Sequence, residues 1–193
     1  IMNKKVITIV SGLPRSGTSM MMKMLEAGGM RILKDEIRKA DEDNSAGYYE
    51  FEKVKELKKD PSWLENAKGK AVKIISSLLE HLPERYTYKI IFMYRNMEEI
   101  LNSQRQMLIR RGEPTDEVSD EKMGKMFLKH LQKIEERLNK QSNMDVLTVH
   151  YNEILKEPAK HGEIINRFLG NTLNTKNMTG VIDQALYHQR GKI

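Results

Sequence analysis

The sequence contains no cysteine. This absence excludes a disulfide framework, a thiol nucleophile and a zinc site built on cysteine ligands. No apolar run approaches the roughly 18 residues that a membrane-spanning helix needs, and no signal-peptide pattern precedes the first predicted strand. The five histidines show no metal-ligand spacing. We therefore expect a soluble, cytoplasmic protein with no membrane span.

The length and composition fit one globular domain over residues 1–193. Hydrophobic residues make up 39% of the chain and charged residues 31%, a balance typical of a folded protein rather than a disordered one. The formal net charge of +6 reflects either a lysine-rich solvated surface or a cluster of cations that faces a polyanionic ligand. Nucleic-acid binding would explain the charge, but no motif for it is present, so we expect no nucleic-acid partner.

Short apolar runs alternate with helical patterns along the chain. Strands are predicted at residues 5–10, 70–76, 88–93 and 146–150, with a further short strand at 30–33. Helices are predicted at 17–27, 52–59, 78–82, 97–110, 119–139 and from Pro158 to Leu169, and little pattern follows residue 170. Strands that alternate with helices favour a parallel sheet covered on both faces. The sequence therefore predicts an α/β fold, with three α/β/α layers and a mainly parallel central sheet.

A glycine-bounded loop follows the first predicted strand. Residues 12–19 read Gly-Leu-Pro-Arg-Ser-Gly-Thr-Ser, between the apolar run 6–10 and a methionine-rich helical segment. Strand, loop and helix in this order are the context of a phosphate-binding loop, whose main-chain N–H groups and helix N-terminus converge on an anion. The Walker A pattern fails at one position, because Thr18 stands in place of its lysine and Arg15 supplies a cation inside the loop.

The magnesium-binding carboxylate of phosphoryl-transfer enzymes is also missing. Those enzymes hold magnesium partly through an aspartate that follows a second apolar strand. Here the other three apolar runs are followed by Arg95, His150 and Ser76. An anionic ligand that carries no magnesium would explain both absences, so we expect no metal.

Two motifs stand at predicted strand ends. Residues 14–19 read Pro-Arg-Ser-Gly-Thr-Ser, and Arg95 is followed eight positions later by Ser103. The first motif resembles the phosphosulfate-binding loop of the sulfotransferases that use 3′-phosphoadenylyl sulfate (PAPS), in the form found in tyrosylprotein sulfotransferases and many bacterial relatives. The second is similar to the arginine and serine with which that family binds the 3′-phosphate.

Two further segments carry the resemblance, which spans about residues 5–170. Residues 151–158 with Phe-Leu-Gly at 168–170 are similar to the family's Tyr-Glu-Asp-Leu…Pro…Phe-Leu-Gly segment, and Gly-Tyr-Tyr-Glu at 47–50 resembles a motif of bacterial members. The resemblance implies a P-loop NTPase-like fold, PAPS as co-substrate and the bisphosphate nucleotide PAP as product. The residues that it implies for nucleotide binding are Pro14, Arg15, Ser16, Gly17, Thr18, Ser19, Arg95, Ser103 and Tyr151.

Sulfuryl transfer needs positioning and charge stabilisation, and three residues are candidates for catalysis. Arg15 matches the family's loop cation, and it would act electrostatically because arginine does not give up its proton. Lys73 lies near the point where tyrosylprotein enzymes carry a catalytic lysine, although their Asp-Pro is absent here; a solvated lysine at a sheet edge is the alternative. Glu50 is the favoured base for an acceptor hydroxyl, and the acidic run 41–43 is its rival.

The acceptor is expected to be a small molecule, a glycan or a peptide with a hydroxyl or amine. Tyr48, Tyr49, Phe51 and Trp63 could form an aromatic acceptor site or could pack in the core. Two alternatives to a sulfotransferase stay open. One is a P-loop nucleotide kinase or NTPase with a degenerate loop, in which the acidic run holds magnesium. The other is a nucleotide-binding module without catalysis. The basic segment 190–192 only faintly resembles the family's C-terminal segment over the nucleotide.

Overall fold

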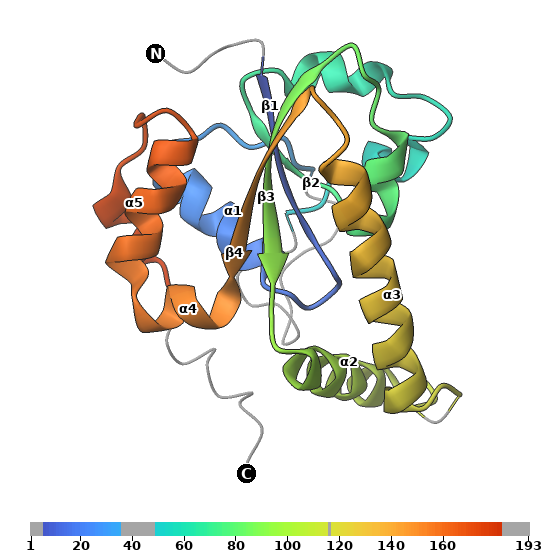
Figure 1. Cartoon of the computed structure of the whole chain (residues 1–193). Helices are drawn as coiled ribbons and strands as arrows, with labels where there is room; N and C mark the ends of the chain where they lie inside the picture. The colour runs from blue at the N-terminus through green and yellow to red at the C-terminus, as the bar shows by residue number, and fades with distance from the viewer. Residues whose placement is uncertain (1–5, 36–48, 116, 183–193) are drawn as a thin grey trace.

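A four-stranded parallel sheet forms the centre of the computed structural model, which describes residues 6–35, 49–115 and 117–182 (Figure 1). The strands lie in the order β2-β1-β3-β4. Their bounds are β1 Val6–Gly12, β2 Ala71–Lys73, β3 Thr87–Tyr94 and β4 Met144–His150. Each neighbouring pair is parallel, so the predicted parallel sheet is confirmed.

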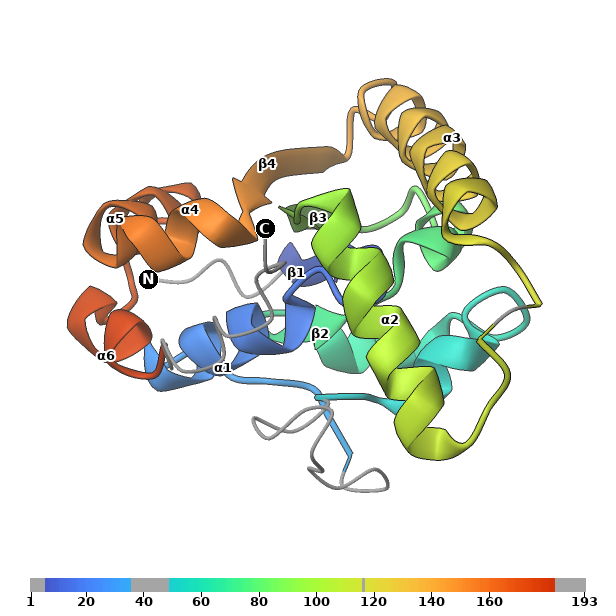
Figure 2. The ribbon, with the colours of Figure 1, turned by 90° about the horizontal axis from the view of Figure 1, so that it is seen from below.

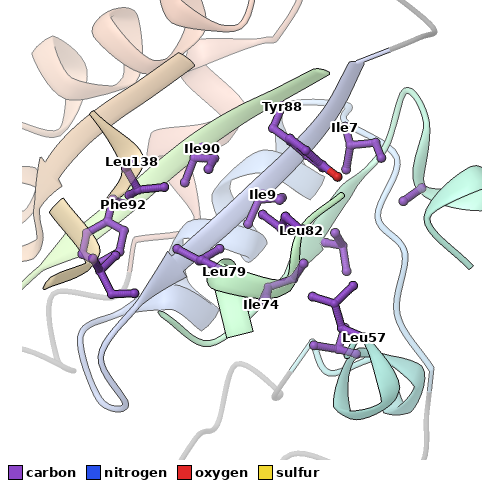
Figure 3. Close-up of a cluster of buried hydrophobic side chains, with 14 of the residues drawn as sticks. Ile7, Ile9, Leu57, Ile74, Leu79, Leu82, Tyr88, Ile90, Phe92 and Leu138 are labelled. Carbon is purple, nitrogen blue, oxygen red and sulfur yellow. The ribbon is translucent and has the colours of Figure 1, made fainter. Parts of the chain in front are cut away.

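Successive side chains of the central strands enter two different hydrophobic clusters. On β3, Ile90 and Phe92 pack in one cluster, whereas Ile91 and Met93 pack in the other, and all four are buried. Figure 3 shows the first cluster, with Ile90 and Phe92 among its labelled side chains. Because side chains alternate between the two faces of a strand, the near-continuous apolar run of β3 reflects a sheet buried on both faces.

Helices cover both faces of the sheet (Figures 1 and 2). One face carries α1 (Thr18–Ala27), α4 (Tyr151–Lys156), α5 (Pro158–Phe168) and α6 (Thr175–Gly180). The other carries α3 (Asp120–Leu138) and the 3-10 helices η1 (Glu52–Glu56), η2 (Ser62–Ala67) and η3 (Ser76–His81). Helix α2 (Met97–Arg111) lies beyond the carboxyl end of β3. The three predicted layers are therefore confirmed.

Two predicted strands are shorter than expected. Residues 30–33 contribute a single bridge, between Ile32 and Ala71, rather than a strand. The strand predicted at 70–76 ends at Lys73. Ile74 then turns into the first hydrophobic cluster, where it is fully buried, and η3 follows directly. The Ile74 N–H still donates to the Val10 carbonyl of β1 at 3.1 Å, and the chain leaves the sheet where η3 begins at Ser76.

The helix predictions differ from the structure in several places, among them the unpredicted 3-10 helix η2 and the segment 78–82, which lies in the 3-10 helix η3. The charged segment 52–59 forms only the 3-10 helix η1. Helix α6 forms where the sequence pattern predicted none: Asn174 caps it by accepting the N–H of Asn177, and Met178 is completely buried in the second cluster. Within the described ranges, the structure contains no helix long and apolar enough to cross a membrane.

The carboxyl ends of all four strands meet at one edge of the sheet. The register pairs Val10 of β1 with Lys73 of β2, and Gly12 of β1 with Met93 of β3. Arg95 follows β3 directly, and Tyr151 follows β4. Ligands of open α/β sheets bind at this edge, and each strand delivers a predicted site residue to it.

Candidate functional site

The loop between β1 and α1 closes tightly on its neighbours at two glycines. A Cβ added to Gly12 would lie 2.5 Å from Ser16 Oγ and 2.6 Å from the Met93 carbonyl oxygen. A Cβ added to Gly17, whose φ is +94°, would lie 2.4 Å from Cδ2 of Tyr151. Real Cβ atoms do not approach so closely, so both positions need glycine, and Gly17 needs it also for its left-handed backbone.

Helix α1 begins at Thr18, and its N-cap is Gly17, which has no side chain that could accept a hydrogen bond from the first turn. The N–H of Ser16 is used within the loop, where it donates to the Leu13 carbonyl at 3.2 Å. The N-terminus of a helix is suited to an anion, because its N–H groups and the helix dipole both favour negative charge.

Arg15 projects from the loop toward α2. Its φ is +67°, a left-handed conformation uncommon outside glycine. Its Nε donates to Ser103 Oγ at 2.9 Å, across 88 positions of sequence. Ser103 is buried on α2. The structure therefore brings the predicted loop cation and the predicted 3′-phosphate serine into direct contact.

Arg95 is held on three sides. Its Nη1 donates to the Arg15 carbonyl at 3.1 Å, and its Nε pairs with a Glu99 carboxylate oxygen at 2.8 Å. Its guanidinium carbon lies 4.5 Å from the ring centroid of Tyr151. Asn152 donates to the other Glu99 oxygen at 2.8 Å. The guanidinium is thus oriented before any ligand arrives, and Nη2 makes no hydrogen bond with the described residues.

Lys73 is not a solvated lysine at a sheet edge. Its side chain is only 11% exposed, and Nζ donates to Ser19 Oγ on α1 at 3.4 Å. Glu50 Oε1 lies 4.0 Å from the same Nζ. The predicted second cation and the predicted base therefore lie together beside the start of α1.

The other predicted loop residues lie at the site in different states of burial. Pro14 is exposed at the tip of the loop, and Thr18 and Ser19 are half-buried at the start of α1. Ser16 is fully buried, and its Oγ makes no hydrogen bond with the described residues. Tyr151 is buried between the loop and Arg95.

The aromatic residues near position 50 divide between packing and loop attachment. Trp63 is buried, and Phe51 meets it edge to face with ring centroids 5.4 Å apart. Trp63 is therefore part of the hydrophobic core, and the half-buried Phe51 packs against it. Tyr49 instead donates its hydroxyl to Glu26 on α1 at 2.7 Å. Tyr48, the acidic run 41–43 and the basic segment 190–192 lie outside the described residues.

Sequence reasoning missed the partners that orient Arg95. Glu99 was readable as an acid four residues after Arg95 on a helix, a spacing at which opposite charges pair. Asn152 carries no such signal, because it reaches Glu99 from a helix that follows another strand. Sequence spacing alone does not reveal that contact.

The comparison with protein families is decisive. A model of the sulfotransferase domain family matches residues 6–190. The chain belongs to the sulfotransferase domain family. This membership favours the sulfotransferase prediction over a P-loop kinase. A search of curated protein sequences found no significant match to this sulfotransferase-family chain.

Solved sulfotransferase structures share the fold. Mouse sulfotransferase SULT7A1 complexed with PAP is 21% identical with a TM-score of 0.57, over 96% of this chain and 64% of that chain. Sulfotransferase STF1 from Mycobacterium tuberculosis H37Rv is 14% identical with a TM-score of 0.59, over 92% and 71%. The sulfotransferase domain of the Synechococcus PCC 7002 olefin synthase is 14% identical with a TM-score of 0.52, over 98% and 85%. The chain thus spans somewhat less than two thirds of the mouse enzyme, and at these identities the likeness establishes the fold.

Proposed function

We propose that this chain transfers a sulfuryl group from PAPS to a hydroxyl or amine acceptor. The observation that carries the proposal is the place of Arg95. It stands at the carboxyl end of β3, where a magnesium-dependent enzyme would place a carboxylate, and it is hydrogen-bonded to the phosphate-type loop through the Arg15 carbonyl. Family membership and the PAP complex of the mouse sulfotransferase support the same nucleotide.

The residues present fit a nucleotide with phosphates at two ends. At Gly12 and Gly17 the neighbouring atoms lie so close to the loop main chain that neither position could carry a side chain. The N-terminus of α1, whose N-cap is Gly17, suits the 5′-phosphosulfate. Nη2 of Arg95 suits the 3′-phosphate, because guanidinium groups bind phosphate through charge-assisted hydrogen bonds. Ser103 lies within reach of the same subsite through its contact with Arg15.

The catalytic roles follow from charge and position. PAPS supplies the sulfuryl group, which passes directly to the acceptor atom as PAP leaves. Arg15 is proposed to stabilise the negative charge on the leaving phosphate without giving up a proton. Lys73, between Ser19 and Glu50, would stabilise charge on the transferring group. Glu50 would accept the proton of the acceptor, and its carboxylate oxygen lies 4.0 Å from Lys73 Nζ.

Thermal shift with defined nucleotides tests the proposal. PAP is expected to raise the Tm of the protein in the absence of magnesium, and Arg95→Ala should abolish that rise. Arg85→Ala is the matched control, because Arg85 lies just before β3 at the opposite end of the sheet and should leave the rise intact. A larger shift with ATP and magnesium than with PAP would refute the proposal and favour the kinase alternative.

Transfer itself needs a separate measurement. Sulfur-labelled PAPS incubated with small phenols, alcohols and amines should label at least one acceptor. PAP binding without transfer to any of them would instead support the binding module that lacks catalysis. The acceptor, the cytoplasmic location and the absence of a metal requirement remain predictions. We infer one domain across the chain, since the family model extends from residue 6 to residue 190.

A further inference from the structure

The residue before Glu50 is fastened to α1 by its side chain. The Tyr49 hydroxyl donates to Glu26 Oε2 at 2.7 Å. Lys34 donates to the other oxygen of the same carboxylate at 2.8 Å, and its Nζ also lies 4.6 Å from the Tyr49 ring centroid. The side chains of Glu26, Lys34 and Tyr49 therefore contact one another, and Tyr49 is the one that directly precedes Glu50 of the candidate site.

Tyr49 adopts a backbone conformation that needs this support. Its φ is +52°, in the left-handed region that bulky side chains rarely occupy and that persists only where surrounding contacts hold it. The turn at Tyr49 sets the direction in which the chain enters Glu50. A side-chain contact with α1 thus determines the course of the main chain at the proposed base.

The main chain around Glu50 is fixed on its other side by Asp35. The N–H of Asp35 donates to the Glu50 carbonyl at 2.9 Å, and the Asp35 carboxylate accepts the N–H of Glu52 at 2.6 Å. The main chain on both sides of Glu50 is therefore held, by Tyr49 before it and by Asp35 at Glu50 and Glu52. Its carboxylate oxygen lies 4.0 Å from Lys73 Nζ, which contacts Ser19 at the start of α1.

We propose that Glu26 and Tyr49 are positioning residues that set Glu50 against Lys73. The proposal rests on the proposed function, since it assumes that Glu50 is the base. Glu26 lies on α1, the helix whose N-terminus forms part of the phosphate-type loop. The pair thereby places the base relative to the helix that holds the nucleotide. Neither residue touches the reacting atoms; both act through Glu50.

The protonation states of Glu26 and Tyr49 keep their hydrogen bond intact across the neutral pH range. Burial raises the pKa of Glu26, but hydrogen bonds from Lys34 and Tyr49 outweigh it and leave the pKa below its ordinary value. Burial and the hydrogen bond to Glu26 raise the pKa of Tyr49 well above its ordinary value. An ionised carboxylate and a neutral phenol persist across the neutral range, so changes in activity there report on other groups.

Tyr49→Phe tests the proposal because it keeps the ring and removes only the hydroxyl. With sulfur-labelled PAPS and the fastest acceptor from the panel above, kcat should fall about tenfold, as small displacements of catalytic groups do. The Tm rise with PAP should be unchanged. Tyr86→Phe is the matched control: its hydroxyl donates to Glu65 at 3.3 Å beyond the amino end of β3, so its loss should leave kcat unchanged.

A double-mutant comparison decides whether Tyr49 acts through Glu50. Adding Tyr49→Phe to Glu50→Gln should change kcat by less than about twofold, because residues that act as a unit are not additive. Three results would overturn this proposal without affecting the proposed function. They are an equal loss of kcat from Tyr49→Phe with and without Glu50→Gln, a wild-type kcat in Tyr49→Phe, and loss of the PAP-induced rise in Tm in that variant. A wild-type protein that binds PAP but transfers to no acceptor would overturn the proposed function, and this inference with it.

Discussion

Replacing Gly17 by alanine tests the packing of the loop against Tyr151. The new Cβ would meet Cδ2 of Tyr151 at 2.4 Å, and the backbone φ of +94° is one that residues with a Cβ rarely adopt. Tyr151 is buried and stacks on the Arg95 guanidinium, so it has little room to withdraw. The substitution should therefore disturb both the loop and the ring against which Arg95 packs.

Gly170 provides the control that separates the two effects. Its φ is +97°, and an added Cβ would meet nothing within 4 Å. A left-handed residue with a Cβ costs about 1–2 kcal/mol, so Gly170→Ala should lose about that much stability. Gly17→Ala adds overpacking, which costs about 1–3 kcal/mol, for a total of about 2–5 kcal/mol. At about 2–4 °C per kcal/mol for a chain of this size, the difference in Tm is measurable.

The assay is denaturant unfolding of both variants, followed by thermal shift with PAP. We expect Gly17→Ala to be less stable than Gly170→Ala and to lose most of the PAP-induced shift, which Gly170→Ala should keep. The double variant Gly17→Ala/Tyr151→Ala removes the ring that the new Cβ would meet. Its loss of unfolding free energy should therefore be smaller than the sum of the losses of the two single variants. Equal destabilisation by the two glycine substitutions would show that Tyr151 does not press on the loop.

Two further predictions concern buried polar groups. Ser16→Ala removes a buried hydroxyl that makes no hydrogen bond with the described residues. The free energy of unfolding should be unchanged or rise by about 1 kcal/mol, while the PAP-induced rise in Tm should shrink if the hydroxyl binds the ligand. An undiminished rise in Tm would remove Ser16 from the binding residues. His130 lies 2.9 Å from Ser76 Oγ, and burial, assisted by Lys133 and opposed by Glu80, lowers its pKa below the ordinary 6.5. The unfolded chain then binds more protons near pH 6, so stability should fall as the pH falls through that range. Denaturant unfolding at pH 7.5 and 5.5 should show a smaller loss in His130→Gln, and an equal loss would contradict the assignment.

Local patterns predicted the parts of the fold that depend on neighbouring residues. The β1–loop–α1 unit follows from an apolar run, two glycines and a helical segment in sequence, and Arg95 follows from the end of a buried strand. Glu50 was predicted from a short motif, and the structure places it beside Lys73. These signals lie within a few residues of one another, where backbone preference and burial act together.

Contacts between distant segments could not be predicted in this way. The hydrogen bonds from Arg15 to Ser103 and from Tyr49 to Glu26 depend on how distant elements of the chain pack together. No local sequence preference specifies that packing. Trp63 is a further case: an indole beside two tyrosines and a phenylalanine suits a pocket or a core equally well, and only its burial distinguishes the two.

The sheet divides the core into two clusters, and this division affects which property is lost first when the protein is heated. Ile90 and Ile91 are neighbours in sequence, but their side chains belong to separate clusters on opposite faces of the sheet. The site joins separate elements at the carboxyl edge of the sheet: Lys73 of β2 contacts Ser19 of α1, and Arg15 of the loop contacts Ser103 of α2. A slight shift of these elements would separate the two pairs while each cluster stayed intact. Variants weakened deep in either core should thus lose the proposed PAP binding at temperatures where the protein is still folded.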